Sequence, residues 1–265
     1  MDKSVQQKLA GSLTAEDVGI LPYLPYLLQD FWELGSEPVL MADMLGDVLL
    51  DGAVVLDLAC GKGAVSVFVA KRLGLAVEGF DLIPEFIEFA KVKACEHGVS
   101  DLCEFEVGDI NEVVKDTTGY DAVILGGVGD VLGNPSQTFD KLLRTIKSGG
   151  YVLIDECMLK DGKSQDDIGY DNYEYLTKKQ WDELFAKKGL ELVRAASGEE
   201  IVAAVAADAP GIEQIRQRAN ELIKMHPDKR EMFEAYVKSQ QSEYDDIDNH
   251  LEGVVWLLRK SDACA

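Results

Sequence analysis

One short stretch, 54–63, holds an aspartate and several small residues where an apolar run breaks into a turn. Asp57 lies in the run, and Ala59, Gly61 and Gly63 follow it. Small residues allow a ligand to approach the backbone closely, and the N–H groups at the start of a following helix form a partly positive cradle. The stretch predicts a strand, a tight turn and a helix, with a ligand site at the turn.

Further acids follow the next apolar runs. Asp81 ends the run 75–81, and Asp109 follows the run 103–107. In a doubly wound sheet, ligands bind outside the carboxyl ends of the strands, and an acid at the end of the second strand accepts hydrogen bonds from ribose hydroxyls. The acids and the turn therefore predict one site for a nucleotide-like ligand at that edge of the sheet.

The glycine pattern indicates which ligand is meant. A dinucleotide-binding turn reads G-x-G-x-x-G, but Ser66 stands at the third glycine position after Gly61 and Gly63. With Asp57, the stretch reads D-x-x-x-G-x-G and resembles motif I, D-x-G-x-G-x-G, of the class I S-adenosylmethionine-dependent methyltransferases. Ala59 stands where that motif has its first glycine. The resemblance continues through Asp81, 108–110, 120–127 and 147–153, and it covers roughly residues 50–196.

The resemblance implies a role for each part of the turn. The backbone of Gly61 and Gly63 would approach the methionine part of S-adenosylmethionine. Asp57 would hold the turn and the amino end of the methionine, with Ala59 in the same cofactor turn. The carbonyl of Gly126, at the end of the fourth strand, would lie near the methionine ammonium.

The resemblance also places the nucleoside. Asp81 would bind the ribose hydroxyls. Either Leu82 or Ile83 would pack on the adenine, and the alternative for both residues is a place in the hydrophobic core. Asp109 would accept a hydrogen bond from the exocyclic amine, with Ile110 against the ring. A solvated loop position remains the alternative for Asp109.

From residue 53 onward, short apolar runs alternate with amphipathic helices, as is typical of a parallel sheet covered by helices on both faces. The expected strands are 53–57, 75–81, 103–107, 121–126, 150–156, 189–195 and 254–258. Asn134 before Pro135, and Thr177 with Gln180, predict helix starts. The predicted fold class is α/β, a doubly wound, seven-stranded, mostly parallel sheet of the Rossmann-like methyltransferase type.

Helical spacing of apolar residues marks the two segments outside the core. One predicted methyltransferase domain, 1–265, comprises a helical cap (1–50), an α/β core (51–196 and 251–260) and a helical insert (197–250) with helices at 212–225 and 232–247. The turn before the fifth strand is expected at 147–150. The insert could cover substrate or form a subunit contact, and a homodimer is left open.

Four tyrosines are candidates for substrate contact. Tyr23 and Tyr26 lie in the cap, and Tyr170 and Tyr173 lie in the loop after the fifth strand. Tyrosine offers apolar surface together with a hydroxyl, which suits a pocket wall. The alternative for the first pair is the packing core between helices, and for the second pair a surface loop.

Methyl transfer is an in-line displacement, and alignment of the two reactants supplies much of the lowering of the barrier. A dedicated base is optional, so the catalytic residue is left unknown. Asp155 and Glu156, at the end of the fifth strand, are the candidates, against a structural or solvated role. The histidines, His97, His226 and His250, are expected to be structural or exposed.

Composition limits the partners. Forty-eight acidic residues against 26 basic ones give a formal charge of −22, which opposes nucleic acid and anionic membrane surfaces. The five cysteines are scattered without metal-ligand spacing, so no metal site is expected. The polar start and the lack of a long apolar run predict a cytoplasmic protein without a membrane partner.

These observations predict an S-adenosylmethionine-dependent methyltransferase that acts on a small molecule. The alternatives are a protein that binds S-adenosylmethionine or S-adenosylhomocysteine without catalysis, and a methyltransferase that acts on a protein. The missing third glycine argues against a nicotinamide-dependent oxidoreductase.

Overall fold

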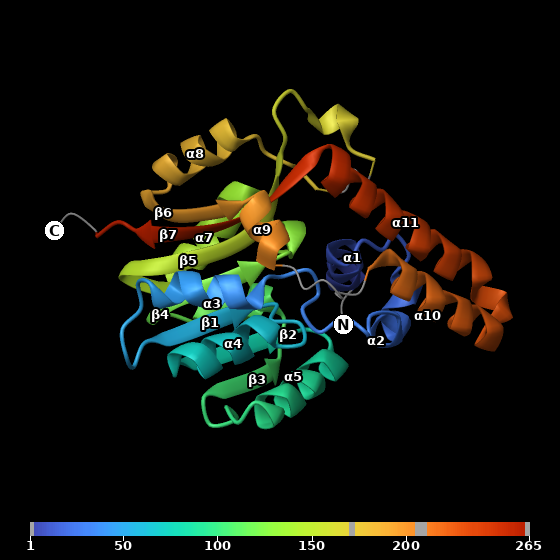
Figure 1. Cartoon of the computed structure of the whole chain (residues 1–265), viewed down its shortest axis with the longest axis horizontal. Coiled ribbons are helices and arrows are strands. Elements are labelled where there is room, and N and C mark those ends of the chain that lie inside the picture. The colour runs from blue at the N-terminus through green and yellow to red at the C-terminus, as the bar shows by residue number, and fades with distance from the viewer. Residues whose placement is uncertain (1–2, 170–172, 205–210, 263–265) are drawn as a thin grey trace.

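The computed structural model describes residues 3–169, 173–204 and 211–262. Its strands are β1 (Val54–Leu58), β2 (Ala76–Asp81), β3 (Cys103–Val107), β4 (Tyr120–Gly126), β5 (Ile146–Leu159), β6 (Leu190–Ser197) and β7 (Leu251–Lys260). They form one sheet in the order β3-β2-β1-β4-β5-β7-β6 (Figure 1). β1 to β5 pair in parallel, and β7 is antiparallel to β5 and β6. The predicted seven-stranded, mostly parallel sheet is confirmed.

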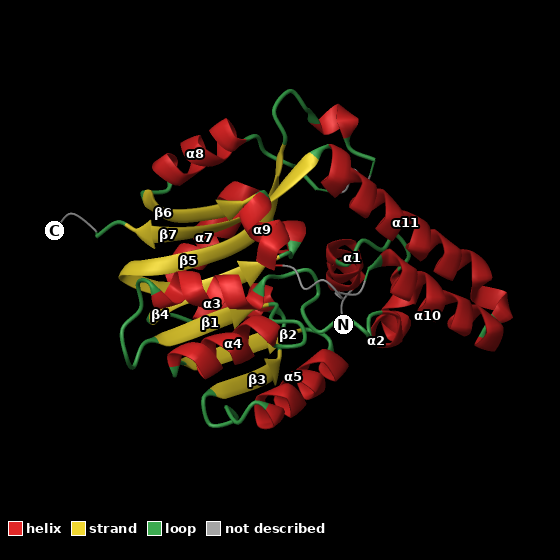
Figure 2. Ribbon diagram, viewed as in Figure 1, coloured by secondary structure: helices red, strands yellow, loops and turns green. Residues whose placement is uncertain are grey.

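Helices cover both faces of the sheet (Figure 2). α3 (Pro38–Gly46), α4 (Ala64–Leu73) and α5 (Pro84–Glu96) pack on one face, and α6 (Ile110–Asp116), α7 (Pro135–Thr145) and α8 (Lys178–Lys187) on the other. Successive side chains of a strand point to opposite faces of the sheet. Val55 therefore enters the core under α3, α4 and α5, the first core layer, and Leu56 enters the core under α6, α7 and α8, the second core layer. Because both faces are buried, the central strands are continuously apolar.

The predicted helix boundaries follow from their caps. The side chain of Asn134 accepts a hydrogen bond from the Gln137 N–H, and that of Thr177 accepts one from the Gln180 N–H, so both helix starts are confirmed. Gly98 has a φ of +70° just after α5, a conformation that glycine adopts without strain.

The fifth strand is longer than the sequence predicted. β5 begins at Ile146, which pairs with Tyr120 of β4, and a register shift follows before Ala122 pairs with Tyr151. The stretch 147–150, predicted as a turn before the strand, therefore lies inside it. The prediction was wrong because a bulge absorbs the two glycines within the strand pairing. β7 also extends beyond 254–258, since it pairs along its length with β5.

The cap contains α1 (Lys3–Ser12), a 3₁₀ helix (Val18–Tyr23), α2 (Leu24–Leu27) and α3, and the insert contains α9 (Glu199–Ala204), α10 (Ile212–Met225) and α11 (Arg230–Asn249). α10 matches the prediction, α11 is longer at both ends, and α9 was not predicted. α2, α10 and α11 lie together beyond the carboxyl ends of the central strands (Figure 1).

One apolar cluster joins the cap to the insert. Leu24 and Leu27 of the cap are fully buried in the cluster that also contains Leu222 and Phe233 of the insert. At its edge Arg218 donates to both carboxylate oxygens of Asp30, at 2.6 and 2.8 Å. The two segments therefore form one packed body, although they stand at opposite ends of the sequence.

None of the helices within 3–169, 173–204 and 211–262 has the length and apolar character needed to cross a bilayer.

Candidate active site

The turn after β1 has three residues in the left-handed backbone region. Gly61 has a φ of +53°, Gly63 of +74° and Ala59 of +56°. A side chain in this region costs roughly 1–2 kcal/mol. Ala59 stands where motif I has a glycine, so the departure noted in the sequence places strain at the turn.

Packing also requires the two glycines. A Cβ atom on Gly63 would lie 2.7 Å from the Cβ of Ala90 and 2.9 Å from the Cζ of Phe105, and one on Gly61 would lie 2.7 Å from Cδ1 of Leu34. Gly63 thus permits α4 to pack closely against α5 and β3. Gly61 permits the cap to lie on the turn.

Asp57 holds the start of α4. The Ser66 hydroxyl donates to its carboxylate at 2.5 Å, and the Ser66 N–H does so as well. Asp57 is 3% exposed, and burial raises its pKa to about 7. Gly63, the residue before α4, has no side chain to cap that helix. A carboxylate or another anion fits this helix start, which is the position predicted for the methionine part of the cofactor.

Asp81 connects the turn to the end of β2. One carboxylate oxygen accepts from the Gly61 N–H and the other from the Ile83 N–H, both at 2.9 Å. Burial raises the pKa of Asp81 to about 6. The Leu82 N–H also donates to the carboxylate. Of its roughly four acceptor sites, one therefore remains for a hydroxyl donor.

The two candidates for adenine contact differ in exposure. Ile83 is buried in the cluster of the cap and the insert, whereas Leu82 is partly exposed. On the next strand connection, Asp109 accepts from the Asn111 N–H at 2.9 Å and caps α6, and Ile110 is buried in the second core layer. Asp109 therefore has a structural task in addition to its predicted role.

The end of β4 lies beside Asp155 of β5. The prediction that Asp155 and Glu156 end the fifth strand was wrong, because pairing with β7 continues β5 to Leu159. Gly126 is paired with Asp155, and the Gly127 N–H donates to the Asp155 carbonyl at 3.0 Å. Asp155 and Glu156 are consecutive, so their side chains point to opposite faces of the sheet. Burial, with the charge of Glu37 added, raises the pKa of Asp155 to about 7. Burial, with the charge of Asp155 added, raises that of Glu156 to about 8.

The predicted tyrosines lie in different places. Tyr173 hydrogen-bonds to Glu156 and is close to the end of β4. Tyr170 lies outside the described residues. The Tyr23 hydroxyl accepts a hydrogen bond from the Lys229 ammonium at 2.7 Å, and the Tyr26 hydroxyl donates to Glu221 at 2.7 Å. Those two tyrosines face the insert, in the packing core between helices that was the alternative to substrate contact.

Lys62 was not recognised from the sequence. Its side chain is 3% exposed, and its ammonium donates to the Leu28 carbonyl at 2.5 Å and lies 5.4 and 5.0 Å from the ring centres of Phe86 and Phe89. Burial lowers its pKa to about 8. Trp32 donates to the Lys62 carbonyl at 3.1 Å. The sequence does show a lysine between two glycines of the turn. Its role could not be predicted from that position, because its hydrogen-bond partner lies in the cap, far away along the chain.

The histidines are away from the strand ends that form the site. His97 ends α5 and contacts Lys71 and the Trp32 ring, and His226 packs on Tyr23. His250 connects α11 to β7. The described residues contain no group of His, Cys, Asp or Glu side chains that could hold a metal ion.

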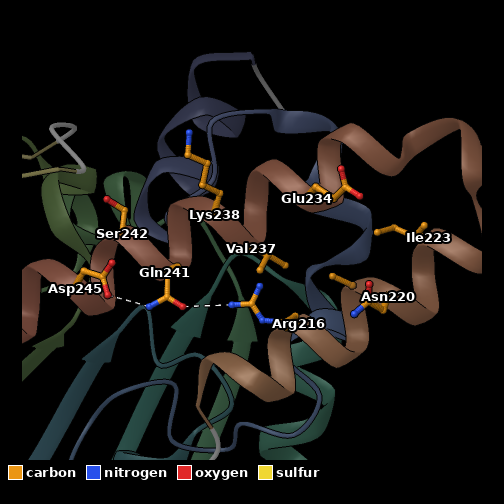
Figure 3. Close-up of a pocket in the computed structure, with 10 residues that line it drawn as sticks. Arg216, Asn220, Ile223, Glu234, Val237, Lys238, Gln241, Ser242 and Asp245 are labelled. Atoms are coloured by element: carbon orange, nitrogen blue, oxygen red, sulfur yellow. Dashed lines mark hydrogen bonds between the residues drawn. The ribbon is translucent and has the colours of Figure 1, made fainter.

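A polar groove lies between α10 and α11 (Figure 3). Across it, Gln241 of α11 accepts from Arg216 of α10 at 3.3 Å. Gln241 also donates to Asp245, one turn further along α11, at 2.9 Å. None of the predicted site residues lines this groove, so it is separate from the strand edge.

The chain is similar in sequence to known methyltransferases. A family model described as a methyltransferase domain matches residues 49–189, more than half of the chain. The chain is 31% identical over 106 residues to a ubiquinone biosynthesis O-methyltransferase from Xanthomonas oryzae pv. oryzae, covering 40% of this chain and 43% of the relative. It is 24% identical over 245 residues to phosphoethanolamine N-methyltransferase 3 from Arabidopsis thaliana, covering 91% of this chain and 46% of the relative. The chain thus spans less than half the length of these curated relatives.

Among solved structures, the fold is similar to that of a SAM-dependent methyltransferase from Thiobacillus denitrificans in complex with S-adenosyl-L-homocysteine. The TM-score is 0.71 at 20% identity, and the match covers 89% of this chain and 97% of that one. This likeness shows that the two chains share a fold.

Proposed function

The chain belongs to the class I S-adenosylmethionine-dependent methyltransferases, and from this premise we propose that it transfers a methyl group from S-adenosylmethionine to a small-molecule acceptor. The observation that carries the proposal is the buried Asp81 carboxylate. It connects the glycine turn after β1 to the end of β2, at the edge of the sheet where a nucleoside binds.

The residues at this edge fit the cofactor. The start of α4, next to Gly63, would offer backbone N–H groups to the methionine carboxylate, and the Gly126 carbonyl would lie near the methionine ammonium. Asp81 would accept from the ribose hydroxyls and Asp109 from the adenine amine, with Ile110 as the predicted contact of the ring. We assign the adenine contact to Leu82 rather than Ile83, because Ile83 is already buried against the cap. When bound, S-adenosylmethionine supplies an electrophilic methyl group on a sulfonium.

Three observations support a small acceptor. The segment 28–37 lies on the glycine turn, with the Leu28 carbonyl on the Lys62 ammonium and Leu34 against Gly61, so the cap covers this part of the edge. The charge of −22 opposes nucleic acid. The names of the two relatives refer to ubiquinone biosynthesis and to phosphoethanolamine, and both ubiquinone and phosphoethanolamine are small molecules. Asp155 and Glu156 remain the candidates for a general base, and a cytoplasmic location and a homodimer remain predictions.

Two measurements test the proposal. Isothermal titration with S-adenosylmethionine and S-adenosylhomocysteine should show binding, and a labelled methyl group should then pass to a component of fractionated cell extract. Label found in the low-molecular-weight fraction supports a small acceptor, whereas label in protein supports the protein-directed alternative. Binding without any transfer of label would instead indicate a non-catalytic binding protein.

A further inference from the structure

Two carboxylates without hydrogen-bond partners, Glu37 and Asp155, lie near enough at this edge for the charge of Glu37 to act on Asp155. Glu37 directly precedes α3 and is 8% exposed, yet its side chain does not cap that helix. Across the described part of the chain, neither Glu37 nor Asp155 has a side-chain hydrogen bond or ion pair. Burying such groups is costly unless something compensates the charge.

The position of the pair is set by α3. Met41 is one helical turn after Glu37, on the same face of α3. A Cβ on Gly126 would lie 3.8 Å from Cε of Met41 and 3.6 Å from the Cβ of Asp155. The first turn of α3 therefore lies over the end of β4, next to Asp155 of β5, and Glu37 directly precedes this turn. This places the pair beside the strand end where the reacting groups meet.

The surroundings of the pair are acidic. Burial raises the pKa of Glu37 to about 7, with a further contribution from the charge of Glu33. Asp155 feels the charge of Glu37 and in turn acts on Glu156. Within the described ranges no lysine or arginine offsets the charge of Glu37 or Asp155. An anionic acceptor would be repelled here, whereas a cation would restore the balance of charge.

We propose that Glu37 and Asp155 together bind the positively charged amine of the acceptor, so that the substrate is an amine-bearing small molecule. The inference rests on the methyltransferase function proposed above. The methionine ammonium of the donor is the competing occupant, because it has the same chemistry. The acceptor is favoured as the occupant, because the ammonium of the donor would have other partners in the Gly126 carbonyl and the turn that Asp57 holds.

Choline and its neutral isostere, 3,3-dimethylbutan-1-ol, are suitable probes. We expect choline to bind the full chain saturated with S-adenosylhomocysteine at least about tenfold more tightly than the isostere. Glu37→Gln and Asp155→Asn should each weaken choline binding about tenfold and leave S-adenosylhomocysteine affinity unchanged. Asp51→Asn, at an exposed acid before β1, is the matched control and should change neither.

A stability measurement separates a binding role from a structural one. Because both substitutions remove a partly desolvated charge that no cation offsets, the ligand-free variants should melt at a higher temperature than the parent. A lower melting temperature would indicate that the carboxylates support the fold, and would overturn the proposal.

The binding results have distinct meanings. Equal binding of choline and the isostere, or no binding of choline beside bound S-adenosylhomocysteine, overturns the amine site but keeps the methyltransferase proposal. If the Glu37→Gln and Asp155→Asn variants bind S-adenosylhomocysteine more weakly but choline equally well, the two carboxylates bind the methyl donor. That result also overturns the amine site. Failure of S-adenosylhomocysteine to bind contradicts the proposed function itself. In that case choline is titrated into the ligand-free protein and its Glu37→Gln variant, and weaker binding by the variant supports the amine site, whereas equal binding overturns it.

Discussion

At the scale of single residues, the Asp81 carboxylate has two tasks. It fixes the backbone of the glycine turn through the Gly61 and Ile83 N–H groups, and we assign it to the ribose. Removal of the side chain therefore affects both the shape of the turn and its ligand. The two effects can be separated, because asparagine keeps one acceptor oxygen and alanine keeps none.

Asp81→Ala is expected to weaken S-adenosylhomocysteine binding by about 1.5–3 kcal/mol, or about 10- to 150-fold, the range for a hydrogen bond to a charged group. Asp81→Asn should weaken it less and should lower the melting temperature less. Isothermal titration and thermal unfolding measure the two effects. Glu106→Gln, at an exposed acid on β3, is the control. Unchanged affinity in a folded Asp81→Ala variant would contradict the ribose assignment.

Ala59 offers a test of backbone strain. Glycine at this position relieves the left-handed conformation, worth roughly 1–2 kcal/mol, against a loss of about 0.4–1 kcal/mol from greater freedom of the unfolded chain. Ala59→Gly should therefore stabilise the protein by about 0.5–1 kcal/mol in urea unfolding. Ala186→Gly, at an exposed position within α8, should destabilise it by about 0.5–1 kcal/mol. Destabilisation by Ala59→Gly would show that the methyl group contributes packing that outweighs the strain.

At the scale of elements, close packing of α4 on α5 and β3 depends on Gly63. The turn cannot tilt away from this contact, since Asp57 holds the start of α4 and Asp81 holds Gly61. The cofactor turn is thus stabilised by three strands and two helices. A side chain at Gly63 would disturb both the packing and the ligand site.

Gly63→Ala and Gly74→Ala form a matched pair. Both positions have a similar positive φ, but a Cβ on Gly63 meets Ala90 and Phe105, whereas one on Gly74 has nothing within 4 Å. We expect Gly63→Ala to cost about 1–3 kcal/mol more than Gly74→Ala in free energy of unfolding, the usual cost of overpacking. It should also weaken S-adenosylhomocysteine binding. Equal costs would show that backbone strain alone explains both glycines.

At the scale of the whole molecule, buried acids gather at the carboxyl edge. Burial raises the pKa values of Asp57 and Asp155 to about 7, of Asp81 to about 6 and of Glu156 to about 8. These values lie above those of the unfolded chain, so between pH 5 and 8 the folded state holds more protons. Stability must therefore fall as the pH rises through this window.

The ligand-free protein is expected to melt at least about 3 °C lower at pH 8 than at pH 5.5, since one pKa unit corresponds to 1.36 kcal/mol. Differential scanning calorimetry at several pH values measures this change. Repulsion within a chain of charge −22 acts in the same direction, but 0.5 M NaCl screens it. If the pH dependence of the melting temperature disappears in 0.5 M NaCl, the effect comes from repulsion between surface charges and not from the buried acids. Asp155→Asn should reduce the part that salt does not remove.

Much of the fold and part of the site could be predicted from local patterns. The strands of the core and α10 follow from apolar periodicity, and the helix starts at Asn134 and Thr177 follow from capping residues. The turn 147–150 was misplaced, because glycines that usually end a strand are held inside β5 by pairing with β4. Tyr23 and Tyr26 could not be placed, because their partners lie on α10 and in the connection that leads to α11.

The sequence by itself determined the doubly wound sheet, the glycine turn and the acid at the end of β2, since each depends on residues close together along the chain or on strand ends that meet at one edge. Only the tertiary structure brought Glu37 to Asp155, Lys62 to the Leu28 carbonyl and Asp30 to Arg218. These pairs depend on how the cap and insert dock on the sheet. Docking is set by the fit of whole apolar surfaces, which no local spacing of residues encodes.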